Sequence, residues 1–97
     1  MRKVTQKDID SLYRAVLCLR TAPEAKRFFR DLLTQTEIEE FAERWKVARL
    51  LAGGVPYTRI VEETGLSSTT VARVSHWVKK GTGGYRIALE RMGKGRV

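Results

Sequence analysis

Small hydroxyl side chains and basic side chains follow one another in a short segment of the last third of the chain. Hydroxyl, guanidinium and ammonium groups hydrogen-bond to phosphate oxygens, and short polar side chains reach base edges in a DNA groove. These residue types therefore suit contact with a nucleic acid. The residues that we expect to make such contacts are Ser67, Ser68, Thr69, Thr70, Ala72, Arg73, His76, Lys79 and Lys80.

The distribution of charge supports this interpretation. The chain carries 19 basic and 11 acidic residues, a net charge of +8. Residues 64–97 hold seven of the basic residues against one acidic residue, whereas residues 1–63 are close to balance. A basic excess concentrated in one part of a chain is typical of proteins that bind polyanions. A solvated basic tail adds to this excess, so the charge alone does not decide the function.

The elements that would present these side chains are those of a helix-turn-helix over residues 56–80. Pro56 begins a short helix to about Thr64, Gly65 allows a tight turn, and Ser67 caps the next helix, which ends near Lys80. Apolar residues in both helices are spaced to meet in one small core between them: Ile60, Val61, Leu66, Val71 and Val74.

A helical hairpin that only packs against the rest of the protein is the alternative. The second helix of such a hairpin would more often expose Glu and Lys on its surface. Here it opens with four hydroxyl residues, 67–70, which are poor helix formers. Their presence favours a helix that contacts DNA.

The rest of the chain predicts helices as well. Apolar residues recur at helical spacing, and no stretch alternates apolar and polar residues as a strand would. The fold class is therefore all-α, with about six helices. Besides the helix-turn-helix, we expect helices over about Gln6–Arg20, from Thr21 onward, over Gln35–Ala52 and over Tyr85–Met92.

The length of 97 residues predicts a single domain. Residues 1–55 would form dimerisation helices, residues 85–92 a C-terminal helix and residues 93–97 a flexible basic tail. The first helices are rich in aromatic side chains that one small subunit cannot cover, which predicts a homodimer: Phe28, Phe29, Phe41 and Trp45.

Several classes of protein are disfavoured by what the chain contains. It has a single cysteine and a single histidine, so it has no zinc-binding cluster, and we expect Cys18 to be a buried apolar residue. It has no paired carboxylates in an apolar setting and no phosphate-binding glycine loop, so we predict no enzyme activity and no metal. Without an apolar run of membrane-spanning length or a signal peptide, it should be a cytoplasmic protein that does not enter a membrane.

Residues 33–80 resemble the Trp-repressor superfamily, in particular its smaller Trp-repressor-like branch. Equivalent or similar residues occur without a gap at Leu33, Thr34, Glu37, Arg44, Leu50, Leu51, Gly54, Gly65, Thr70, Val71 and Arg73. The resemblance implies a bacterial protein that forms an intertwined homodimer. Its long central helices would cross between subunits, and two helix-turn-helix heads would lie on one side.

The resemblance also implies a ligand pocket. Thr34, Arg44, Thr70 and Arg73 match positions where the family binds tryptophan. However, the family has a glycine and a serine where this chain has Val74 and Trp77, whose bulk would occupy the space of the ligand. We therefore expect no tryptophan cofactor. The sequence leaves open whether another small molecule acts as an effector.

The sequence thus predicts a sequence-specific transcriptional regulator, a repressor that binds a two-fold-symmetric operator in double-stranded DNA. One alternative is an interaction adaptor whose helix-turn-helix contacts the transcription machinery. Another is the DNA-binding part of a transposase, although the chain lacks the coiled coil or catalytic partner that such a protein needs.

Overall fold

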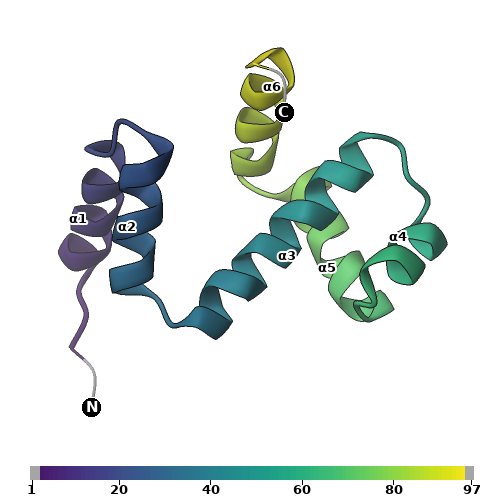
Figure 1. Ribbon diagram of the computed structural model, residues 1–97, viewed down its shortest axis with the longest axis horizontal. Coiled ribbons are helices and arrows are strands. Elements are labelled where there is room, and N and C mark those ends of the chain that lie inside the picture. Colours follow the sequence, from purple (N-terminus) through teal and green to yellow (C-terminus); the bar gives the residue numbers. More distant parts are fainter. Residues whose placement is uncertain (1–2, 96–97) are drawn as a thin grey trace. The chain divides into compact units, whose positions relative to one another are not determined.

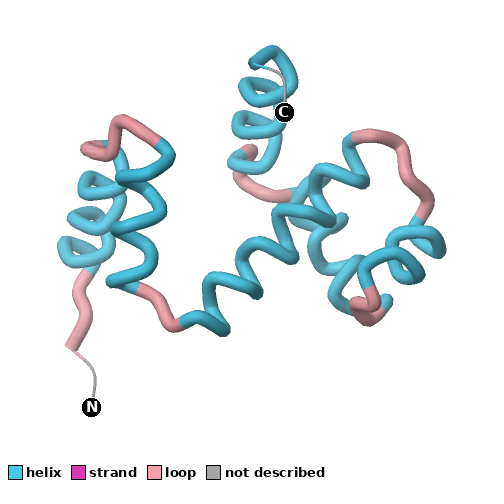
Figure 2. Tube along the Cα trace, viewed as in Figure 1, coloured by secondary structure: helices cyan, strands magenta, loops and turns pink. Residues whose placement is uncertain are grey.

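The computed structural model of the protein describes residues 3–95 and contains helices as its only regular elements in that range (Figures 1 and 2). The predicted all-α fold with six helices is confirmed. The helices are α1 (Gln6–Leu17), α2 (Ala22–Leu32), α3 (Gln35–Ala52), α4 (Tyr57–Thr64), α5 (Ser68–Lys80) and α6 (Gly84–Gly95). No helix among the described residues is long and apolar enough to cross a membrane.

The chain divides into two compact units, Met1–Ile38 and Glu39–Val97. Unit 1 holds α1, α2 and the first turn of α3, and unit 2 holds the rest of α3 with α4, α5 and α6. The helix-turn-helix therefore belongs to unit 2.

The helices of unit 1 begin with side-chain caps. The Asp8 N–H donates to the Thr5 hydroxyl (3.2 Å), and the Thr5 N–H donates to the Asp8 carboxylate (2.9 Å), as in a capping box. These hydrogen bonds from the Thr5 backbone and side chain lower the pKa of the exposed Asp8 carboxyl. The cap thus stabilises α1 at neutral pH, and its contribution is lost as the pH falls through the lowered pKa.

The end of α1 differs from the prediction. The helix ends at Leu17 rather than near Arg20, because the Arg20 N–H donates to the Glu24 carboxylate (2.9 Å) and so belongs to the start of α2. Cys18 is exposed, so the prediction of a buried Cys18 is wrong for the single chain.

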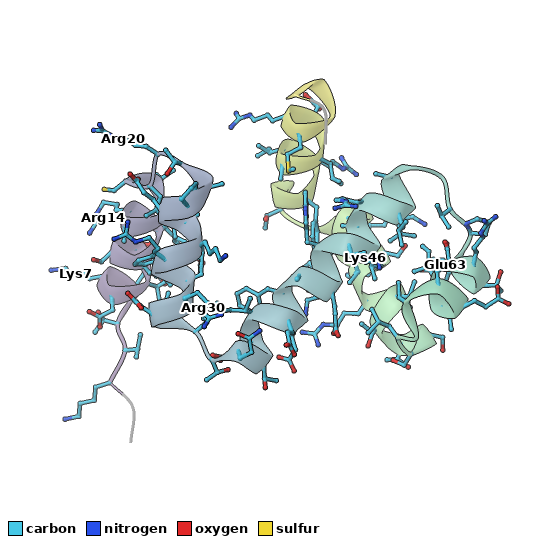
Figure 3. All side chains as sticks on the ribbon, in the orientation of Figure 1. Lys7, Arg14, Arg20, Arg30, Lys46 and Glu63 are labelled. Atoms are coloured by element: carbon cyan, nitrogen blue, oxygen red, sulfur yellow. The ribbon has the colours of Figure 1, made fainter. Side chains whose placement is uncertain are left out.

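Unit 1 leaves its apolar side chains in contact with solvent. Neither α1 nor α2 contains a buried residue. Tyr13 is 61% exposed and Leu17 is 82% exposed, and Ile9, Leu12 and Leu32 are exposed too. Figure 3 shows basic side chains such as Lys7, Arg14 and Arg20 extending outward from the same unit. A helix pair of this kind gains little stability from its own packing.

Unit 2 contains the buried core. Five side chains from α3, α4 and α5 form it, and none is more than 2% exposed: Val47, Ala48, Ile60, Val71 and Val74. Trp45, Leu50, Leu51, Val55, Val61, Leu66, Val78 and Tyr85 pack around it, partly buried. The predicted core between α4 and α5 is confirmed. The side of α3 that carries Val47 completes it, whereas Phe41 of the same helix is 48% exposed.

The C-terminal helix is longer than predicted. It runs to Gly95 and not to Met92, so residues 93–95 are helical where we predicted a flexible tail. A glycine lowers the stability of a helix by about 1 kcal/mol relative to alanine. This cost is too small to end a helix that has already nucleated. Arg96 and Val97, the rest of the predicted tail, lie outside the described residues.

The turn of the helix-turn-helix gives a test of the local fold. Gly65 has φ +72°, a left-handed conformation, and a Cβ there would meet no atom within 4 Å. Gly65→Ala should therefore lower the free energy of unfolding by about 1 kcal/mol through backbone strain alone. Gly84→Ala is the matched control, because Gly84 lies in open space at the first position of α6 and should be neutral or slightly stabilising. Urea denaturation measures both variants, and equal effects would contradict this account of the turn.

Candidate nucleic-acid interface

A network of short hydrogen bonds shapes the turn between α4 and α5. Gly65 ends α4, and its N–H donates to the Val61 carbonyl (2.9 Å). The Thr64 hydroxyl donates to the Ile60 carbonyl (2.6 Å) and accepts from the Leu66 N–H (3.2 Å). These bonds satisfy the backbone groups left free where the chain changes direction.

Ser67 caps α5 as predicted. Its hydroxyl accepts a hydrogen bond from the Thr70 N–H (3.1 Å) and lies 3.0 Å from the Thr70 hydroxyl. The backbone of Ser67 is extended, which is typical of a residue that caps a helix. The predicted helix-turn-helix over residues 56–80 thus has Pro56 and Ser67 as the caps of its two helices.

Seven of the nine predicted contact residues share one side of α5. At about 100° per residue, they span an arc of about 140°. The buried residues Val71 and Val74 lie on the opposite side, and Ser75, which is also buried, lies beside the edge of this arc. We call this exposed side the recognition face; its residues are Ser68, Thr69, Ala72, Arg73, His76, Lys79 and Lys80, all of them exposed.

Two of the predicted contact residues lie elsewhere. Ser67 is exposed at the cap, next to the recognition face. Thr70 points to the other side of α5 and is partly buried, and its hydroxyl lies beside that of Ser67. The structure therefore does not place Thr70 among the side chains that face outward.

Among residues 3–95, the cations of the recognition face have no acidic partner. An ion pair joins Arg59 and Glu63 of α4 instead (3.7 Å). Arg73, Lys79 and Lys80 form none with the carboxylates of this range. Their charges remain available for phosphate groups, which is where most protein–DNA hydrogen bonds go.

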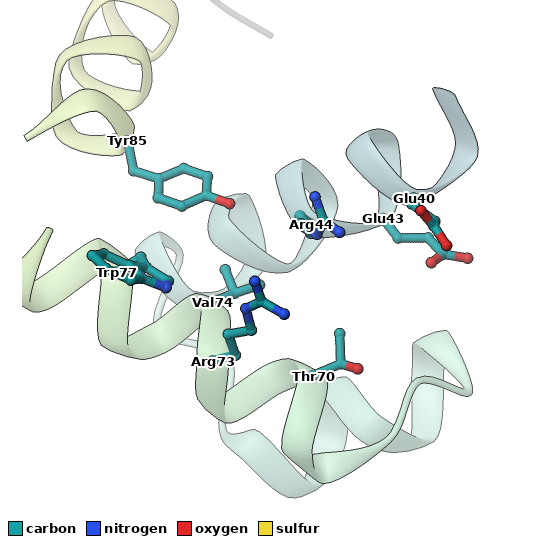
Figure 4. A pocket seen from close by; sticks show the side chains of 8 residues that line it. All are labelled: Glu40, Glu43, Arg44, Thr70, Arg73, Val74, Trp77 and Tyr85. Atoms are coloured by element: carbon teal, nitrogen blue, oxygen red, sulfur yellow. The ribbon is translucent and has the colours of Figure 1, made fainter. Parts of the chain in front are cut away.

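A pocket of about 360 Å³ lies between α3, α5 and α6 (Figure 4). Arg44 and Arg73 contribute guanidinium groups to it, as the resemblance implied, and Thr70, Val74 and Trp77 line it as well. Thr34, the other residue expected at the pocket, belongs to unit 1 and caps α3, with its hydroxyl accepting from the Glu37 N–H (3.1 Å).

Three further residues line this pocket that sequence reasoning missed: Glu40, Glu43 and Tyr85. Figure 4 shows the two carboxylates at one end of the pocket and the rings of Trp77 and Tyr85 at the other, with the guanidinium groups between them. Glu40 stands one helical turn before Arg44, so helical spacing could have indicated it. Tyr85 comes from α6, and nothing in the sequence placed α6 beside α3.

Val74 and Trp77, the residues expected to fill the ligand space, lie in the wall of this pocket. Val74 is 2% exposed and belongs to the core. Trp77 is 49% exposed, and its ring lies edge-on to that of His76, with 5.2 Å between the ring centroids. Both bulky side chains therefore border the space beside Arg44 and Arg73.

Comparison with known proteins agrees with this architecture. The sequence model of the family described as Trp repressor protein matches residues 7–93. The uncharacterized protein YerC of Bacillus subtilis (strain 168) is 40% identical over 90 residues, which cover 93% of this chain and 86% of YerC.

Two solved structures are similar as well. A TrpR-like protein from Eubacterium eligens ATCC 27750 has a TM-score of 0.83 at 37% identity, covering 92% of this chain and 91% of that one. A candidate Trp repressor from Staphylococcus aureus has a TM-score of 0.81 at 35% identity, covering 88% of this chain and 85% of that one. With its helix-turn-helix and the match over nearly its whole length, the chain belongs to the Trp repressor family.

Proposed function

We propose that the chain is a sequence-specific DNA-binding regulator of transcription, a repressor that acts in the cytoplasm of a bacterium. The observation that carries this proposal is the recognition face, where hydroxyls and unpaired cations lie together on the exposed side of α5. A helix with such a face fits the major groove, with its first residues at base edges and its cations at phosphates. Membership in the Trp repressor family supports the same function.

We further propose that the protein binds DNA as an intertwined homodimer. The support is the exposed apolar surface of unit 1, where neither α1 nor α2 buries a single side chain. Association with a second copy would remove this surface from water, at about 25 cal/mol per Å² of apolar area. Two copies related by a two-fold axis would then present two recognition faces to a two-fold-symmetric operator.

The pocket beside α5 is not proposed as a tryptophan site. The carboxylates of Glu40 and Glu43 line it together with the guanidinium groups of Arg44 and Arg73. Val74 and Trp77 in its wall are bulkier than the glycine and serine of the family, which reduces the space for an indole ring. We therefore propose that α5 holds its place without tryptophan.

The first test is the salt dependence of DNA binding. A dimer that makes ~6–10 phosphate contacts should lose about 10³–10⁵ in affinity between 50 and 200 mM salt, because each contact releases a counterion. Fluorescence anisotropy with a labelled random-sequence duplex measures this slope. A nearly flat plot would contradict a nucleic-acid partner and favour the adaptor that contacts the transcription machinery.

The second test concerns the recognition face. Arg73→Ala should weaken DNA binding roughly 10- to 100-fold, since it removes a charge-assisted hydrogen bond. Arg14→Ala is the matched control: it removes the same side chain from an exposed position of α1 and should have a small effect. Anisotropy on the same duplex compares the two variants, and equal losses would show that only total charge matters.

Within the same face, Ser68→Ala and Thr69→Ala should change the preferred DNA sequence while the melting temperature stays within a few degrees. Both residues are exposed, and alanine is a better helix former than either. Selection from a randomised duplex library, run with parent and variants, measures the preference. Identical enriched sequences would mean that these residues do not contact bases.

A further test concerns the effector. The affinity for a selected duplex should be the same with and without millimolar L-tryptophan, and calorimetry should show no heat of binding. A ligand shifts an equilibrium only by its difference in affinity for the two states. A tenfold gain in DNA affinity with tryptophan, about 1.4 kcal/mol, would overturn the proposal.

A further inference from the structure

The carbonyl groups at the C-terminal end of α5 need hydrogen-bond donors from outside the helix. Gly81 still donates its N–H to the Trp77 carbonyl (2.9 Å), but its backbone is extended, and the chain leaves the helix there. The carbonyls of Val78 and Lys79 then lose the N–H groups that a further turn would supply. The Arg86 side chain of α6 supplies donors instead: its Nη2 donates to the Lys79 carbonyl (2.8 Å) and its Nε to the Val78 carbonyl (3.3 Å).

Tyr85, the residue before Arg86, contacts α3. Tyr85 stacks on Trp45 of α3, with 6.3 Å between the ring centroids and 10° between the ring planes. Tyr85 also packs against the core of unit 2. Two consecutive residues in the first turn of α6 therefore bind α3 and α5 separately.

The segment between α5 and α6 would not hold this arrangement by itself. Its glycines allow many conformations, and Gly83 has φ +96°. Gly81 permits a close approach, because a Cβ at that position would clash with the Trp77 carbonyl oxygen. The angle between α5 and α6 therefore depends on the contacts that follow the glycines.

We propose that Arg86 is a positioning residue for DNA binding, through the hydrogen bonds that join its guanidinium group to the last turn of α5. This inference rests on the proposed function. The turn that Arg86 holds carries Lys79 and Lys80, so a frayed turn would displace two cations of the recognition face. A positive group at a helix C-terminus is favourable. The planar guanidinium can present two donors to adjacent carbonyls in a fixed geometry, which an ammonium group cannot.

Hydrogen exchange of the full-length parent and of Arg86→Gln tests the hydrogen bonds without DNA. We expect the amides of Val78, Lys79, Lys80 and Gly81 to exchange roughly 3- to 10-fold faster in the variant, because local opening of that turn becomes easier. Arg91→Gln is the matched control, since it removes the same charge from an exposed position of α6 and should leave these amides unchanged. Arg86→Lys should restore protection in part. Unchanged exchange in Arg86→Gln would overturn the proposal, whether or not the protein binds DNA.

Binding to a duplex selected from a randomised library tests whether Arg86 positions α5 for DNA binding. Arg86→Gln should weaken binding about 3- to 10-fold while the slope of log affinity against log salt stays that of the parent. A phosphate contact would instead lower that slope by about one unit. A lower slope, or parental affinity in spite of faster exchange, would contradict a positioning role. If the parent binds no duplex, the proposed function fails, and hydrogen exchange alone decides whether Arg86 holds the turn.

Discussion

Val71 and Val74 of α5 pack with Ile60 of α4 and with Val47 and Ala48 of α3 in one small buried core. Burial of each valine or isoleucine side chain is worth about 1.5–3 kcal/mol, so this contact sets the rotation of α5 about its own axis. The exposed side of α5 follows from that rotation, because a change of one residue in register would turn the helix by about 100°. The recognition face therefore owes its orientation to apolar residues on the other side of the same helix.

The two units of the chain differ in how they are stabilised. Unit 2 has this core, and its helices are further joined by the Trp45–Tyr85 stack and the hydrogen bonds of Arg86. Unit 1 has capped helices but no buried side chain. We propose that a second copy of the chain covers unit 1, so dimerisation and DNA binding would belong to separate parts of one small protein.

Much of the fold was predictable because local rules act on adjacent residues. The caps at Thr5, Thr21 and Ser67 and the left-handed Gly65 could be inferred from residue type and spacing, and the structure has each of them. Contacts between distant segments were not predictable in this way. Tyr85 lies beside the pocket and Arg86 lies at the end of α5 because of the way α6 packs. Helical periodicity does not predict that packing.

In the proposed dimer, two recognition faces bind one duplex. Hydroxyl-radical footprinting of the protein on a duplex from the library selection tests it most directly. We expect two protected regions related by two-fold symmetry, with centres about one helical turn apart (~34–36 Å). A single asymmetric protected region, or no protection at protein concentrations that saturate binding, would contradict it.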